Sequence, residues 1–204
     1  MDSALLVFAV DDDPLVLRAV ERMLRLHSIA VEGFTSPDAF LARPPHDGVA
    51  CLLLDLKMPG MSGLDVQTAM TAKGISMPII FLSAQSDIPS TVRAMRDGAI
   101  DFLEKPVDED QLLAALERAR LLSIAMRQEQ HRQQDAEQRL ARLTKRERQV
   151  CDLVAAGLLN KQIALELGMS EKTVKVHRGR VTRKLDVGSV AALVRLLSTR
   201  ATPS

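Results

Sequence analysis

The stretch CLLLDLKMPG, residues 51–60, decides how the N-terminal part of this chain folds. Its first four residues are apolar, which is typical of a strand that is buried on both faces of a parallel sheet. The run ends in the carboxylate of Asp55, and Lys57 and a Pro-Gly turn follow at once. Because ligands of open parallel sheets bind at the carboxyl ends of the strands, Asp55 is the first candidate for a functional residue.

Apolar runs and helical patterns alternate on both sides of this stretch. The expected strands are 4–10, 30–34, 49–54, 78–83 and 99–103. The expected helices are 14–26, 36–42, 64–70, 88–97 and 109–122. Strands that alternate with helices in this way favour an α/β fold, a doubly wound five-stranded parallel sheet with helices on both faces.

The composition changes after this alternating region. The stretch RQEQHRQQDAEQRLAR, residues 127–142, is almost entirely polar and rich in strong helix formers. We therefore predict a solvated helical linker over 121–142, between a domain at 1–120 and a second at 143–204. A coiled-coil dimer is the weaker interpretation, because apolar residues do not recur every 3.5 positions. Four short helical patterns follow the linker, so the second domain is expected to be all-α.

The net charge of +1 conceals two opposite halves. Residues 1–118 carry 10 Lys and Arg against 18 Asp and Glu, which is −8, and residues 119–204 carry 17 against 8, which is +9. The basic half favours nucleic acid as a partner. No stretch approaches the roughly 18 apolar residues of a membrane span, and the N-terminus lacks the pattern of a signal peptide. We therefore expect a cytoplasmic protein without a membrane partner.

Polar residues follow four of the expected strands. They are Asp11 to Asp13 after the first strand, Asp55 at the third, Ser83 at the fourth and Lys105 after the fifth. Carboxylates that are packed together need a shared cation or a proton, and Mg²⁺ prefers such oxygen ligands. An aspartate beside Mg²⁺ can attack phosphorus, while a lysine neutralises the phosphoryl oxygens. The pattern predicts Asp55 as the nucleophile, with Ser83 and Lys105 binding its phosphorylated product.

The segments VDDDP, LLLDLKMPGMSG, FLSA and DFLEKP resemble the four motifs of the receiver domain of two-component response regulators. That resemblance implies the CheY-like fold with strand order 2-1-3-4-5. It also implies that Asp55 is the phosphoacceptor and that Asp12 binds Mg²⁺ directly. Asp11 is then expected to act largely through water, and the backbone carbonyl of Lys57 to complete the metal site around Asp55.

The same resemblance implies a conformational switch. Ser83 is the expected switch hydroxyl and Phe102 the expected switch aromatic, and the Lys105–Pro106 bond is expected to be cis. Phosphorylation would draw Ser83 toward the phosphoryl group and let Phe102 turn inward. The surface formed by residues 88–120 would then change shape, and the family implies that this surface forms a homodimer.

The segment LTKRERQVCDLVAAGLLNKQIALELGMSEKTVKVHRGRVTRKL resembles the LuxR-type helix-turn-helix domain, over residues 143–200. The exposed side of its second helix, which enters the major groove in this motif, is expected to present Lys172, Lys175 and Arg178. The resemblance implies groove or base contacts by Lys175, Val176 and Arg178. It implies phosphate contacts by Thr173, Asn160, Lys161 and Lys184. Gly179 departs from the larger residue that is usual at its position.

These features together favour a response regulator of the FixJ/NarL type rather than an enzyme. Its expected partners are a sensor histidine kinase, double-stranded promoter DNA and a second copy of the chain, with RNA polymerase as a further candidate. One alternative is a Mg²⁺-dependent phosphatase that forms an aspartyl phosphate within Asp11–Asp13. Another is a regulator that works unphosphorylated, through protein contacts alone.

Overall fold

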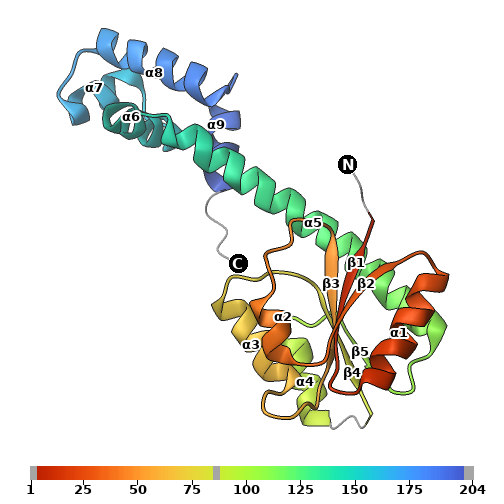
Figure 1. The fold of residues 1–204 in the computed structure, drawn as a ribbon. Coiled ribbons are helices and arrows are strands. Elements are labelled where there is room, and N and C mark those ends of the chain that lie inside the picture. The colour runs from red at the N-terminus through yellow and green to blue at the C-terminus, as the bar shows by residue number, and fades with distance from the viewer. Residues whose placement is uncertain (1–3, 85–87, 200–204) are drawn as a thin grey trace. The chain divides into compact units, whose positions relative to one another are not determined.

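A computed structural model of the protein describes residues 4–84 and 88–199 (Figure 1). The chain forms two compact units, an N-terminal unit ending at Arg127 and a C-terminal unit beginning at Gln128. The strands are β1 (Leu6–Val10), β2 (Ala30–Phe34), β3 (Ala50–Asp55), β4 (Ile79–Ser83) and β5 (Asp101–Glu104). The helices are α1 (Pro14–Leu26), α2 (Pro37–Ala42), α3 (Gly63–Ala72), α4 (Ile88–Arg96), α5 (Glu109–Ala141), α6 (Lys145–Ala155), α7 (Asn160–Leu167), α8 (Glu171–Leu185) and α9 (Val190–Ser198).

The N-terminal unit is built on one parallel sheet with the order β2-β1-β3-β4-β5. Every residue of β3 and β4 is buried, as the uninterrupted aliphatic runs predict. Residues of α1 and α5 form the core on one face, and residues of α2, α3 and α4 form the core on the other (Figure 1). The predicted doubly wound fold and its strand order are confirmed.

Several element boundaries differ by one or two residues from the sequence-based expectation. The last strand begins at Asp101 rather than at residue 99, and β3 spans Ala50–Asp55 rather than residues 49–54. Local signals explain where several helices begin. Asp13, Ser36 and Ser62 cap α1, α2 and α3 with their side chains, and proline occupies the first turn of both α1 and α2.

Helix α5 continues well beyond the predicted residue 122. The Ser123 hydroxyl accepts a hydrogen bond from the Ala50 N–H (3.1 Å), and Arg127 donates to the Gly48 carbonyl (3.1 Å), so both belong to the N-terminal unit. The prediction of a solvated segment 121–142 is wrong at Ser123, Ala136 and Leu140, which are buried. The hydroxyl of Ser123 has a backbone partner, which explains how it tolerates burial. The linker role of the segment and the domain boundaries at 120 and 143 stay predictions.

The C-terminal unit contains the four short helices α6 to α9 around an aliphatic core. Thr144 and Glu147 form a capping box at the start of α6, and Ser170 caps α8. Gly168 adopts φ +62° at the end of α7, a left-handed conformation that permits the tight turn into α8. Helices α7 and α8 pack through the faces that carry Ile163, Val174, Val181 and Leu185, which are fully buried or nearly so. In the described ranges, no helix has both the length and the apolar character needed to span a membrane.

Candidate functional site

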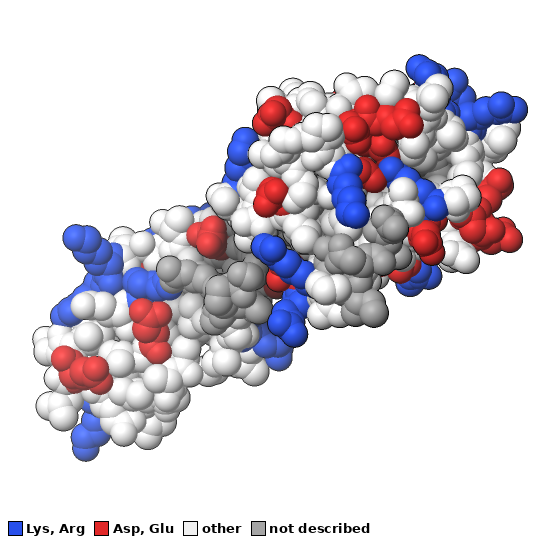
Figure 2. Space-filling model, turned by 90° about the horizontal axis from the view of Figure 1, so that it is seen from below, with Lys and Arg blue, Asp and Glu red and all other residues white. Residues whose placement is uncertain are grey.

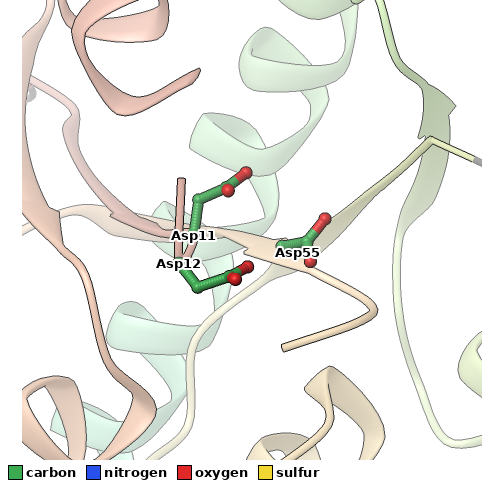
Figure 3. A group of neighbouring side chains, drawn as sticks. All are labelled: Asp11, Asp12 and Asp55. Carbon is green, nitrogen blue, oxygen red and sulfur yellow. The ribbon is translucent and has the colours of Figure 1, made fainter. Parts of the chain in front are cut away.

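Three carboxylates converge at the carboxyl edge of the sheet. Asp11 and Asp12 directly follow β1, and Asp55 ends the neighbouring strand β3 (Figure 3). One oxygen from each residue lies within 4.8 Å of those of the other two. Asp11 and Asp55 are only 3% and 5% exposed, whereas Asp12 is exposed. In the right-hand body of Figure 2, acidic side chains gather near the middle of the face, with basic ones beside them.

Lys105 supplies positive charge to this cluster. Its ammonium group donates hydrogen bonds to Asp11 Oδ2 and Asp55 Oδ1, at 2.5 Å each. Burial raises the pKa of Asp55, and the nearby charge of Asp11 raises it further, while Lys105 opposes both effects. Burial works to lower the pKa of Lys105, but its two carboxylate partners outweigh burial and raise it. Lys105 therefore stays charged between the two acids.

Backbone groups fix the direction of the carboxylates. The Asp13 N–H donates to Asp11 Oδ1 (3.0 Å), and the Lys57 N–H donates to Asp55 Oδ2 (3.0 Å). The loop after β3 returns so closely that a Cβ on Gly63 would lie 2.5 Å from the Asp55 carbonyl oxygen, so no larger side chain fits there without movement. Sequence reasoning did not single out Gly63. The loop MPGMSG, residues 58–63, therefore packs directly against the backbone of Asp55 at the carboxyl edge of the sheet.

The residues at this edge fit a divalent cation of the Mg²⁺ type. Hard carboxylate oxygens are its preferred ligands, at about 2.0–2.1 Å, which places opposite ligands about 4.2 Å apart. The three carboxylate oxygens already lie within 4.8 Å of one another, so small movements would bring them into that geometry. Asp13 belongs elsewhere, because its carboxylate caps α1 by accepting from the Leu15 N–H (2.8 Å). The predicted metal contact of the Lys57 carbonyl stays a prediction.

The two predicted switch residues lie on neighbouring strands. Ser83 ends β4, is 1% exposed, and its carbonyl accepts from the Lys105 N–H at 2.7 Å. Phe102 is half-buried in β5 and stacks on Phe81 with ring centroids 6.4 Å apart. The Lys105–Pro106 peptide bond is cis, as expected. Ser83 and Lys105 therefore lie at the same sheet edge as the acids, as predicted.

The exposed face of α8 carries three of the predicted nucleic-acid contacts, Thr173, Lys175 and Val176, together with other basic residues. The side chains of Lys172, Thr173, Lys175, Val176, Arg180 and Arg183 are exposed along it. Arg178 is half-buried instead, so the expectation that it lies on the exposed side is wrong. It follows Val174 by four residues and precedes Val181 by three, which places it on the flank of the buried face. Lys161 is exposed on α7.

Lys184 has partners inside the C-terminal unit. Its ammonium group donates to Glu147 Oε2 (2.6 Å) and to the Arg142 carbonyl (3.1 Å). Glu147 is 3% exposed and also accepts from the Thr144 N–H at 2.9 Å. These hydrogen bonds, led by that from Lys184, lower the pKa of Glu147 to about 2. The predicted phosphate contact of Lys184 therefore competes with a bond that joins α6 to α8.

Comparison with known proteins agrees with this architecture. Residues 7–117 match the response regulator receiver domain, and residues 141–197 match the luxR family of bacterial regulatory proteins. The chain is 43% identical over 195 residues to the response regulator protein TodT of Pseudomonas putida, covering 96% of this chain and 86% of TodT. It is 40% identical over 201 residues to the transcriptional regulatory protein FixJ of Azorhizobium caulinodans, covering 96% and 93%. The solved response regulator StyR is 46% identical, covers 96% of this chain and 98% of its own, and superposes with a TM-score of 0.81.

The parallel sheet with its acid cluster defines the N-terminal unit as a receiver domain, and the C-terminal unit is a DNA-binding helix-turn-helix domain. The chain belongs to the two-component response regulators that join a receiver to a LuxR-type domain, and it acts in transcription regulation.

Proposed function

We propose that a sensor histidine kinase phosphorylates this protein on Asp55, with Mg²⁺ as the cofactor. The observation that carries the proposal is the surroundings of Asp55. Its carboxylate is buried at the end of β3, within 4.8 Å of oxygens of Asp11 and Asp12, and bonded at 2.5 Å to Lys105. Clusters of buried, charged groups whose pKa values are shifted are typical of functional sites, and transfer of an anionic group needs both a cation and a nucleophile in such a cluster.

The chemistry follows from the positions of these groups. A carboxylate oxygen of Asp55 attacks phosphorus, and an O–P bond forms as the N–P bond of the kinase phosphohistidine breaks. The departing imidazole takes up a proton from solvent. Lys105 already contacts Asp55 through its ammonium group, so it can shift to the phosphoryl oxygens as they arrive. Mg²⁺, held by Asp11, Asp12, Asp55 and the Lys57 carbonyl, would neutralise charge on the transferred group.

The phosphoryl group would then act on the switch residues. It brings close to two negative charges and three acceptor oxygens into the pocket. The Ser83 hydroxyl would donate a hydrogen bond to one of the phosphoryl oxygens. Phe102 would then leave its stacked position on Phe81 and turn inward. Moving such a switch from 1:99 to 99:1 requires about 5.5 kcal/mol of differential interaction. A few charge-assisted hydrogen bonds in a shielded pocket supply energies of this order.

The output of this switch is proposed to be dimerisation and promoter binding in the cytoplasm. Lys175 and Val176, exposed on α8, would contact base edges in the major groove. Thr173 and Lys161 would contact phosphates, which position the domain without reading sequence. A homodimer would place two copies of α8 on half-sites about one helical turn apart. RNA polymerase is the proposed further partner at the promoter.

The phosphatase alternative is less well supported by the same contacts. It requires a nucleophile among Asp11–Asp13, yet the Asp13 carboxylate caps α1, and the buried carboxylate of Asp55 at the end of β3 would then have no role in the reaction. It also leaves the DNA-binding domain without a purpose. Regulation without phosphorylation would in turn leave the acid cluster unexplained. Comparing DNA affinity with and without acetyl phosphate separates this last alternative from the main proposal.

The phosphoacceptor is tested by labelling with acetyl phosphate. Wild-type protein with Mg²⁺ should acquire an acid-stable, base-labile acyl phosphate of one group per chain, and Asp55→Asn should acquire none. Asp13→Asn is the matched control, because asparagine also caps a helix and the change removes a carboxylate two residues from Asp11. It should label like the wild type. Undiminished labelling of Asp55→Asn would assign the phosphoryl group to another residue.

A further inference from the structure

A hydrogen bond joins α7 to the recognition helix α8. The Arg178 guanidinium donates through Nη1 to Oδ1 of Asn160, at 2.7 Å. Asn160 is the first residue of α7, and Arg178 lies in the middle of α8. Both side chains are half-buried, and the two helices pack side by side within the C-terminal unit (Figure 1). The bond therefore restrains a long cationic side chain close to the surface that would meet DNA.

The position of Arg178 on α8 determines which part of the DNA it can reach. At 100° per residue, Lys172, Gly179 and Arg183 share the centre of the exposed face. Arg178 lies about 100° from Gly179, on the flank next to buried Val174. When a helix lies in the major groove, its central face points at base edges and its flanks point at the groove walls. The walls are sugar and phosphate, so a restrained arginine on the flank suits a phosphate.

We propose that Asn160 is a positioning residue that acts on DNA binding through Arg178, which contacts a backbone phosphate at the edge of the groove. The inference rests on the proposed binding of α8 to DNA. A guanidinium has five N–H donors, so its bond to Asn160 leaves donors for a phosphate. A restrained arginine loses less side-chain freedom on binding than a free one. This differs from the direct phosphate contact of Asn160 that the family resemblance implies.

A double-mutant cycle separates the two roles. Affinity of the full-length protein for a random-sequence 30-base-pair duplex is measured by fluorescence anisotropy for Asn160→Ala, Arg178→Ala and the double variant, at several salt concentrations. Asn160→Ala should weaken binding about two- to tenfold, the effect of releasing one side chain. In the Arg178→Ala background the same change should have almost no effect. A direct contact by Asn160 would instead weaken binding equally in both backgrounds.

Salt dependence provides a readout that a purely structural role would not move. Arg178→Ala should reduce the slope of log K against log salt by about 0.9, because one phosphate contact is lost. Asn160→Ala should leave the slope unchanged, because the arginine charge is retained. Lys161→Ala is the matched control, since this exposed neighbour should have the same effect with and without Arg178. An unchanged slope in Arg178→Ala would overturn the phosphate contact.

Folding and function are checked separately. Melting temperatures of all variants are recorded. If Asn160→Ala does not fold, Asn160→Ser replaces it, because serine is also favoured at helix starts but lacks the amide group that bonds Arg178. If the wild type binds no duplex, the proposed DNA binding itself fails. If the wild type binds and the cycle is additive, only the positioning role of Asn160 fails.

Discussion

At the scale of single residues, the charge of Asp55 is held in an unfavourable place. Burial and the neighbouring Asp11 raise its pKa, and Lys105 offsets this only in part. A carboxyl group whose pKa is raised by folding begins to destabilise the folded state as pH rises above its ordinary pKa, and the destabilisation is complete above the raised pKa. The contacts of the Asp55 carboxylate orient it but do not fully offset the cost of its burial, so the rest of the fold must stabilise the domain.

Asp55→Asn is accordingly expected to stabilise the receiver domain at pH 7. The amide removes the buried negative charge yet can still accept from Lys105. The melting temperature, followed by calorimetry, should rise at pH 7, at roughly 2–4 °C for each kcal/mol in a chain of this size. The gain should shrink as pH falls through the raised pKa of Asp55 and vanish below the ordinary carboxyl value of 3.8, because the wild-type side chain is then neutral in both the folded and the unfolded protein. A gain of equal size at low and neutral pH would contradict the electrostatic cause.

Gly179 allows a second prediction at this scale. A Cβ on Gly179 would meet nothing within 4 Å, so the folded domain itself has no steric need for glycine there. Gly179→Ala should increase the unfolding free energy by about 0.5–1 kcal/mol through helix propensity, as measured by urea denaturation followed by circular dichroism. Gly168→Ala is the control with the opposite sign, because φ is +62° at that position. Loss of stability in Gly179→Ala would show that this glycine has a structural role.

At the scale of elements, an ion pair between buried Glu147 and partly exposed Lys184 joins the start of α6 to the end of α8. The Glu147 carboxylate accepts hydrogen bonds from the Thr144 N–H and from the Lys184 ammonium group. The pKa of Glu147 is lowered by folding, from 4.5 to about 2. A lowered pKa stabilises the folded state above pH 4.5, and this contribution is lost as pH falls from about 4.5 to about 2.

Removing Lys184 tests whether this pair is structural. Lys184→Ala leaves the Glu147 carboxylate buried without its cation, which should cost about 1–3 kcal/mol of unfolding free energy at pH 7. The deficit should shrink in acid, as the glutamate takes up a proton. Lys145→Ala, which removes an exposed charge from the first turn of α6, is the control and should change stability by less than about 0.5 kcal/mol. If Lys184→Ala is as stable as this control, the ion pair is not structural, and the predicted phosphate contact is the better explanation of Lys184.

At the scale of the whole molecule, the acidic and basic halves have different partners. The receiver is the proposed target of the kinase, and the basic domain is the DNA-binding part. Coupling between them requires that a charge added at Asp55 alter an equilibrium elsewhere in the molecule, and dimerisation is the proposed equilibrium.

Sedimentation with a phosphoryl mimic tests this coupling. Mg²⁺ together with beryllofluoride should convert wild-type protein from monomer to dimer and should tighten binding to a duplex with two half-sites more than to one with a single half-site. Asp55→Asn should remain monomeric under the same conditions. Dimers that form to the same extent without the mimic would separate oligomerisation from phosphorylation.

The sequence by itself determined the sheet, its flanking helices and the chemistry of its edge. Strands buried on both faces are apolar almost throughout, so β3 and β4 can be recognised in the sequence as aliphatic runs. The polar residues that end these runs indicate a functional site at the edge of the sheet. Capping residues such as Thr144 and Ser170 likewise marked helix starts through local hydrogen bonds. These features depend on neighbours in the chain, which a sequence displays directly.

Only the tertiary structure decided which distant side chains meet. Lys105 bridges Asp11 and Asp55, Asn160 holds Arg178, and Ser123 ties α5 to β3 across 73 residues of chain. Periodicity indicates which face of an element is buried, but the partner of a long side chain depends on how helices and strands pack in three dimensions. For that reason Arg178, expected on the exposed face of α8, was found on its flank.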